Sequence, residues 1–174
     1  GGCLGFFLEK AGKDVTLIAR GKHLEAIRKN GLTIQKLWDG SRETLPVKAC
    51  TAEEYKEIPD VILVCIKGYS MDETVPTIKK IAGKETVVIP ILNIYGTGGR
   101  LQKKLPELTV TDGCIYVSAN ILEPGVILQH GKILRVVFGA RKPEEETEKM
   151  REVAKNMATD DLEVILSENI RRDA

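Results

Sequence analysis

Two glycines at the start of the chain and an arginine about 20 residues further on have the spacing of a dinucleotide site. Gly1 and Gly2 open a predicted helix at residues 2–11, and Arg20 directly follows a β-branched run at residues 14–19. The free N–H groups at the start of a helix stabilise phosphate oxygens. We therefore predict a pyrophosphate site at Gly1 and Gly2, with Arg20 where the adenosine ribose is read.

The residue type at position 20 favours NADP over NAD. An Asp or Glu at this place would accept hydrogen bonds from the ribose 2′-hydroxyl and repel a 2′-phosphate, whereas the planar fork of Arg20 donates to a dianionic phosphate. On spacing alone, two other interpretations stay open. Gly1 and Gly2 are also compatible with an ordinary turn, and Arg20 with an exposed arginine that has no ligand.

The elements that must position these residues alternate between short buried strands and helices, which predicts a largely parallel α/β sheet. We expect strands at residues 14–19, 32–37, 43–49, 61–66 and 86–92, and helices at 2–11, 23–30, 71–81 and 98–104. Thr51 is expected to cap a further short helix. Residues 108–119, 126–130 and 133–138 are rich in β-formers and predict an antiparallel extension of the sheet. At the end, Pro143 should begin a helix, residues 162–165 form a strand, and Ser167 cap a last helix.

Composition excludes several classes of partner. The 174 residues include 26 basic and 25 acidic side chains, a net charge of +1, which gives no overall field for nucleic acid or an anionic membrane. The apolar runs are too short to cross a bilayer. The four cysteines form no close pair of the kind that zinc or redox motifs need. We expect a cytoplasmic protein with buried free thiols and no metal; its oligomeric state is open, with a homodimer as one option.

An ordered series of motifs resembles the ketopantoate reductase (2-dehydropantoate 2-reductase) family over essentially the whole chain. The first matching segment is AGKDVTLIARG at residues 11–21, followed by Gly31-Leu32 before a strand. The later segments are VCIKGY at 64–69, PILN at 90–93, EPGVI at 123–127 with His130, Gly131 and Phe138-Gly139 after it, and ENIRR at 168–172. Their order along the chain makes the resemblance more specific than any single motif.

This resemblance implies a Rossmann-like parallel sheet with helices on both faces and an antiparallel extension. Residues 1–166 would form the NADP-binding domain without its first strand. Residues 167–174 would begin the interdomain helix that leads to a helical substrate domain, which is absent from the chain. The implied reaction is the reduction of 2-dehydropantoate, a small 2-keto acid, to pantoate on the route to pantothenate and coenzyme A, with NADPH as hydride donor.

The resemblance also implies roles for individual residues. Gly1, Gly2, Arg20, Lys67 and Asn93 would bind NADPH, with Lys67 adding a second positive charge on the adenosine side. Asn93 would position the nicotinamide and the substrate, because an amide both donates and accepts hydrogen bonds. For these last two residues the alternatives are an exposed lysine after a buried strand and a turn asparagine.

Three features depart from the family pattern. Asn93 is followed by Ile94-Tyr95-Gly96 where the family has glycine, and Tyr69 is followed by Ser70 where it often has glutamine. The general-acid lysine of the family is not in this chain, so the isolated chain should show weak or no turnover. His23 and His130 have no carboxylate motif beside them, and we expect neither to be catalytic. Two alternative functions are a dehydrogenase of another 2-keto or hydroxy acid and a non-catalytic dinucleotide sensor.

Overall fold

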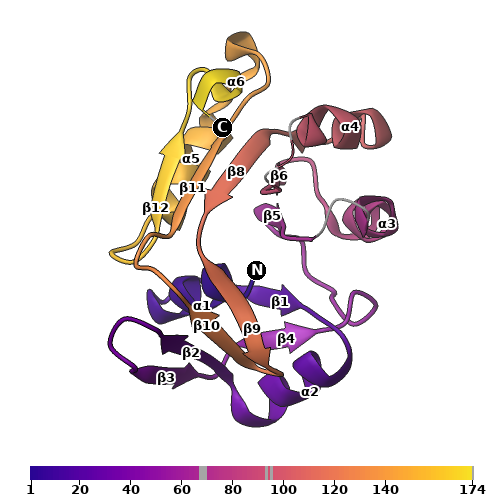
Figure 1. Ribbon diagram of the computed structural model, residues 1–174. Coiled ribbons are helices and arrows are strands. Elements are labelled where there is room, and N and C mark those ends of the chain that lie inside the picture. Colours follow the sequence, from indigo (N-terminus) through magenta and orange to yellow (C-terminus); the bar gives the residue numbers. More distant parts are fainter. Residues whose placement is uncertain (67–69, 93, 95, 174) are drawn as a thin grey trace. The chain divides into compact units, whose positions relative to one another are not determined.

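The computed structural model describes residues 1–66, 70–92, 94 and 96–173. It divides into two compact units (Figure 1). Unit 1 consists of residues 1–55, 116–134 and 159–162, and unit 2 of residues 56–115, 135–158 and 163–174.

Unit 1 contains two sheets of mixed direction and two helices. Strands β1 (Thr16–Ile18) and β4 (Lys48–Cys50) pair in parallel. A second sheet has the order β3-β2-β10-β9, in which β10 is parallel to β2 while β3 and β9 run antiparallel to their neighbours. Its strands are β2 (Leu32–Lys36), β3 (Arg42–Leu45), β9 (Ala119–Glu123) and β10 (Val126–Gln129). The antiparallel pair of β9 and β10 agrees with the predicted extension, although β9 starts only at the last residue of the stretch expected at 108–119.

Helix α1 (Gly2–Lys10) lies at the centre of unit 1, and α2 (Gly21–Asn30) follows β1. Every residue of α1 from Cys3 to Leu8 is buried, because the helix packs against β1 and against strands of the second sheet. A helix that is apolar all round is typical of an element enclosed by others. Helix α2 has a narrower apolar stripe, with Leu24 and Ile27 buried.

Unit 2 contains a parallel sheet in the order β5-β6-β7 with helices on both faces. Its strands are β5 (Val61–Val64), β6 (Val87–Pro90) and β7 (Thr109–Val110). Helices α3 (Met71–Ile81) and α4 (Thr97–Lys104) lie beside each other, and their apolar residues form one core cluster with Val88 (Figure 1). Because side chains alternate along a strand, Val87 and Ile89 point to the opposite face, where they are also buried and α5 (Glu148–Met157) contacts β6. These parallel strands between helices confirm the predicted Rossmann-like α/β fold.

A further three-stranded sheet in unit 2 has the order β12-β11-β8. Its strands are β8 (Asp112–Tyr116), β11 (Arg135–Gly139) and β12 (Glu163–Leu166), with β11 and β12 parallel. A 3-10 turn, η2 (Pro143–Glu145), precedes α5, and α6 (Ile170–Asp173) follows β12.

The strand expected at residues 43–49 is two strands. Strand β3 ends at Leu45 and β4 begins at Lys48. Pro46 stands between them, and proline has no N–H to donate to a strand ladder. The turn predicted before β3 is present, since Gly40 has a φ of +70° and the N–H of Ser41 donates to Oδ1 of Asp39 at 2.9 Å.

The short helix expected at Thr51 is wrong, because the chain forms only a turn there. The side-chain contacts of a helix cap are nevertheless made. The N–H of Thr51 donates to Oε1 of Glu54 at 2.9 Å, and the N–H of Glu54 donates to Oγ1 of Thr51 at 3.3 Å. Pro59 follows closely and disfavours a helical conformation at Ile58, so the turn is not extended into a helix.

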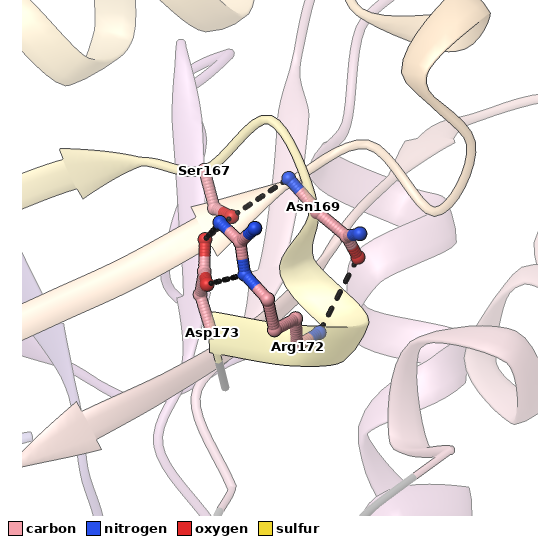
Figure 2. Close-up of polar contacts among 4 residues, drawn as sticks. All are labelled: Ser167, Asn169, Arg172 and Asp173. Atoms are coloured by element: carbon pink, nitrogen blue, oxygen red, sulfur yellow. Dashed lines mark hydrogen bonds and ion pairs between the residues drawn. The ribbon is translucent and has the colours of Figure 1, made fainter.

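Two helix starts near the end of the chain differ from the sequence prediction. Pro143 begins only the 3-10 turn; α5 starts at Glu148, where Oγ1 of Thr147 accepts a hydrogen bond from the N–H of Met150 at 3.2 Å. Ser167 is not the cap of α6. Figure 2 shows that Oδ1 of Asn169 accepts from the N–H of Arg172, while the Ser167 hydroxyl accepts from the N–H of Asn169 and donates to Asp173. Ser167 thus holds the cap residue in place.

Candidate cofactor-binding site

The first turn of α1 lacks a side-chain cap. Gly1 is the N-cap residue, and its carbonyl accepts the N–H of Gly5 at 2.9 Å, which closes the first helical turn. A glycine N-cap has no side-chain oxygen to bind the first N–H groups of the helix. No acidic residue lies in the first turn. The helix start predicted at Gly1 and Gly2 is therefore present, with a positive dipole end that no side chain neutralises.

Glycines also allow α1 to lie close to the neighbouring strands. A Cβ at Gly2 would be 2.8 Å from Cδ1 of Ile127 in β10, and one at Gly5 would be 2.5 Å from Cδ2 of Leu17 in β1. Any larger side chain would force Ile127 or Leu17 to move. The spacing of Gly1 and Gly2 in the sequence does not indicate the role of Gly5, because its contact with Leu17 depends on the packing of α1 against β1.

Arg20 lies at the carboxyl end of β1. The N–H of Ala19 donates to the carbonyl of Cys50 at 3.0 Å, which extends the parallel pairing of β1 with β4 up to the residue before Arg20. Arg20 itself has an extended backbone and is the N-cap residue of α2. Its side chain is exposed, and no residue in the described ranges forms a hydrogen bond or ion pair with it.

The first turn of α1 and Arg20 belong to the same end of unit 1. Helix α1 and strand β1 are joined by a short connection and run in opposite directions, and Leu17 of β1 packs against Gly5 of α1. From Leu17 the strand continues toward the start of the helix, and Arg20, the second residue after β1, therefore comes on the side of Gly1 and Gly2. The carboxyl ends of parallel strands are where open α/β sheets bind ligands.

Lys67 and Asn93 lie outside the described residues. Strands β5 and β6, which precede them, are parallel neighbours in unit 2 with Val64 opposite Pro90. Lys67 and Asn93 therefore each come three positions after the end of one of two paired strands. Their roles in binding the cofactor remain predictions.

The unusual sequence after Asn93 leads directly into α4. Gly96 is the N-cap residue of this helix and has a φ of +81°, the left-handed conformation that glycine adopts without strain. The hydroxyl of Thr97 donates to the carbonyl of Ile94 at 2.6 Å. Gly96, two residues after Ile94, is thus the residue with the left-handed conformation at the start of α4.

His23 has a structural role that sequence reasoning did not assign. Its Nδ1 accepts a hydrogen bond from the N–H of Gly125 at 2.9 Å, which ties the first turn of α2 to the turn between β9 and β10. Burial lowers the pKa of the imidazole below its usual value. His23 therefore supports the helix that Arg20 caps.

Other kinds of site find little support in the described part of the chain. It contains no group of three or more His, Cys, Asp or Glu side chains placed to hold a metal ion. None of the four cysteines, all of which are described, forms a disulfide; Cys3 and Cys114 are buried, and burial raises the pKa of the Cys3 thiol to about 11. Across the described helices, none combines the length and the apolar character that crossing a bilayer requires.

Comparison with known proteins gives consistent matches. A family model described as ketopantoate reductase PanE/ApbA matches residues 1–143. A 2-dehydropantoate 2-reductase of Pyrococcus horikoshii is 33% identical over 172 residues, which are 98% of this chain and 54% of the relative. The crystal structure of a 2-dehydropantoate 2-reductase from Porphyromonas gingivalis is similar with a TM-score of 0.82 and 29% identity, over 97% of this chain and 60% of that one.

A D-mandelate dehydrogenase solved with NADH and anilino(oxo)acetate has the same fold. Its TM-score is 0.84 over 97% of this chain and 54% of that one, but at 21% identity the likeness concerns the fold alone. The chain spans 54% to 60% of the length of these three proteins.

Proposed function

Because the chain belongs to the ketopantoate reductase PanE/ApbA family, we propose that it is the NADPH-binding part of an oxidoreductase that converts 2-dehydropantoate to pantoate. The observation that carries the proposal is Arg20, an exposed guanidinium at the carboxyl end of β1 with no ion pair among the described residues. The name of the Pyrococcus horikoshii relative supports the choice of substrate.

The residues of unit 1 fit a dinucleotide phosphate. The start of α1 offers N–H groups without a side-chain cap, and Gly2 lets this helix start lie close to Ile127 of β10. With the pyrophosphate at this helix start, the adenosine ribose would lie near the end of β1. Arg20 would then donate hydrogen bonds to the 2′-phosphate, a contact that NADH does not offer.

When bound, NADPH would supply the hydride that adds to the C2 carbonyl carbon of the keto acid. Lys67 would add positive charge on the adenosine side, and Asn93 would orient the reacting groups through its amide. The carbonyl oxygen must gain a proton as the hydride adds to carbon, and the family resemblance assigns that proton to a lysine that is not among these 174 residues.

The test is an assay of NADPH oxidation by the protein that contains this chain. With 2-dehydropantoate as substrate, kcat/KM should exceed the value for pyruvate and for benzoylformate. A preference for another 2-keto acid would contradict the choice of substrate but leave the oxidoreductase proposal standing. Tight NADPH binding without turnover on any keto acid would instead favour a dinucleotide sensor.

A further inference from the structure

A cavity of about 720 Å³ lies beside α4 in unit 2. One side is formed by α4, including Gly99, Arg100 and Lys103, and the other by residues around Arg141 and Met150. All of its lining residues are among those described. The volume falls within the range of small-molecule sites, which is roughly 300–1,000 Å³.

The cavity is lined by an excess of positive charge. Three cationic side chains, Arg100, Lys103 and Arg141, face one carboxylate, Glu145. No ion pair with a described residue neutralises any of the three cations. Lys104, the next residue of the same helix, differs because its Nζ lies 2.8 Å from Oδ1 of Asp72. On the cavity side of α4, Lys103 forms no ion pair with a described residue, and Arg100 acts on Asp72 only as a minor charge effect that lowers the pKa of that carboxyl.

Arg141 contributes a donor that lacks an acceptor. Its Nε is buried and forms no hydrogen bond with the described residues. The guanidinium lies over the first turn of α4, with Nη1 3.6 Å from the position that a Cβ of Gly99 would take. Because Arg141 lines the cavity and no described residue forms an ion pair with it, an anion bound in the cavity would stabilise the guanidinium.

The start of α4 adds to the same positive potential. Its N-cap residue is Gly96, no acidic residue lies in the first turn, and no side chain caps it. The hydroxyl of Thr97 is turned away from capping, because it donates to the carbonyl of Ile94. A helix start and a guanidinium side by side are stabilised by a bound anion.

The rest of the lining combines apolar residues with the polar side chains of Gln102, Thr109 and Thr147. Pro106, Leu108 and Met150 offer carbon surface beside the cations. Gln102 braces this part, since its Nε2 donates to the carbonyls of Leu105 at 2.8 Å and Leu108 at 2.9 Å. The cavity therefore combines a fixed apolar wall with a basic end.

We propose that this cavity binds a phosphorylated small molecule with an apolar body. Arg141 and the first turn of α4 hold the phosphate, Arg100 and Lys103 add charge, and the body of the ligand packs against Pro106, Leu108 and Met150. All residues that line this cavity belong to unit 2, and Arg20 is not among them.

The experiment titrates the purified protein with phenyl phosphate, inorganic phosphate and benzoate, and follows the backbone amides and the Arg141 Nε–H by NMR. Phenyl phosphate should bind more tightly than inorganic phosphate, because only the ester has an apolar body, and more tightly than benzoate, which carries less charge. The shifted signals should centre on Gly96, Gly99 and Arg141.

Arg141→Gln should weaken phenyl phosphate binding about tenfold or more, the loss of one charge-assisted hydrogen bond. Lys104→Gln, on the same helix but outside the cavity, is the matched control and should change nothing. If Arg141→Gln does not fold, the double variant Arg100→Gln/Lys103→Gln is tested instead. It should weaken phenyl phosphate binding by the same factor. Unchanged binding in these cavity variants, or shifts confined to Gly2 and Arg20, would overturn the proposal.

Discussion

The backbone N–H of Gly125 donates a hydrogen bond to Nδ1 of His23 across 102 residues of sequence. Gly125 has a φ of +81° and forms the turn of the EPGVI segment between β9 and β10, while His23 lies in the first turn of α2. Only a neutral imidazole can accept this bond, since both nitrogens of the protonated ring are donors. The bond thus couples the helix that follows Arg20 to the protonation state of His23.

This coupling predicts a loss of stability at mildly acidic pH. The pKa of His23 is lowered in the folded protein, so near pH 6 the unfolded chain binds more protons than the folded one. The stability that neutral His23 contributes to the folded protein is fully present above the unfolded pKa of about 6.5. It is lost as the pH falls through the lower pKa of the folded protein. His23→Ala should lower the free energy of unfolding by about 1 kcal/mol at pH 7.5 and by less at pH 5, as measured by urea denaturation.

His23→Asn is the informative comparison, because its side-chain carbonyl can accept from Gly125 without titrating. It should retain more stability than His23→Ala and lose the part of the pH dependence that His23 supplies. His130→Ala, at an exposed histidine that contacts Asn120, serves as the control. A wild-type pH dependence that persists in both His23 variants would contradict this account.

The carboxyl group of Glu54 should titrate far below its usual range. Hydrogen bonds from the N–H of Thr51, from the Arg28 guanidinium and from the Thr51 hydroxyl lower the pKa of Glu54 to about 2. Because the shift is downward, its contribution to stability is present above the unfolded pKa of about 4.5 and is lost as the pH falls from there toward 2. An NMR titration of the Glu54 carboxyl carbon measures the midpoint.

Arg28→Gln should raise that midpoint but not restore the usual value, because the Thr51 N–H still donates to the carboxylate. Lys29→Gln, at the next residue of α2, removes the same charge without removing a hydrogen bond to Glu54 and should leave the midpoint nearly unchanged. A wild-type midpoint close to 4.5 would show that the turn is not closed in solution.

Two adjacent glycines of α4 should respond in opposite ways to alanine. A Cβ at Gly98 would lie 2.3 Å from the backbone carbonyl oxygen of Thr111, whereas one at Gly99 would meet nothing closer than Nη1 of Arg141 at 3.6 Å. Gly98→Ala should therefore lower the free energy of unfolding by about 1–3 kcal/mol. Gly99→Ala should raise it by up to about 1 kcal/mol, since alanine favours the helix. Equal stability of the two variants in urea would contradict the packing of α4 against residues 111–112.

Elements specified by local periodicity were predictable from the sequence. Helix α3 spans the predicted residues 71–81, because Met71, Val75 and Ile78 recur at helical spacing and form part of one core cluster. The place of Arg20 after a strand followed from the same local pattern. The start of a helix was harder to predict where two nearby residues could each serve as its cap. Ser167 and Asn169 before α6 are an example, since Asn169 is the residue that caps the helix.

Contacts between distant segments were not predictable. Nothing near His23 in the sequence indicates that its partner is Gly125, and Arg141 is about 40 residues from the α4 turn over which its guanidinium lies. The residue types at Thr51 and Glu54 are compatible with these two reciprocal hydrogen bonds both in a single turn and at the start of a helix. The sequence therefore did not show which of the two forms. Lys67 and Asn93 fall outside the described residues, so their part of the site remains a prediction.

The central proposal is that Arg20 gives the protein a preference for NADPH over NADH. Equilibrium binding of the two cofactors measures this preference most directly. Dissociation constants are determined for the wild type, for Arg20→Ala and for Lys22→Ala, an exposed control two residues further along. Arg20→Ala should weaken NADPH binding by about 1.5–3 kcal/mol and leave NADH nearly unchanged, because only NADPH carries the 2′-phosphate. An equal loss for both cofactors, or no loss for NADPH, would contradict the assignment of Arg20 to the 2′-phosphate.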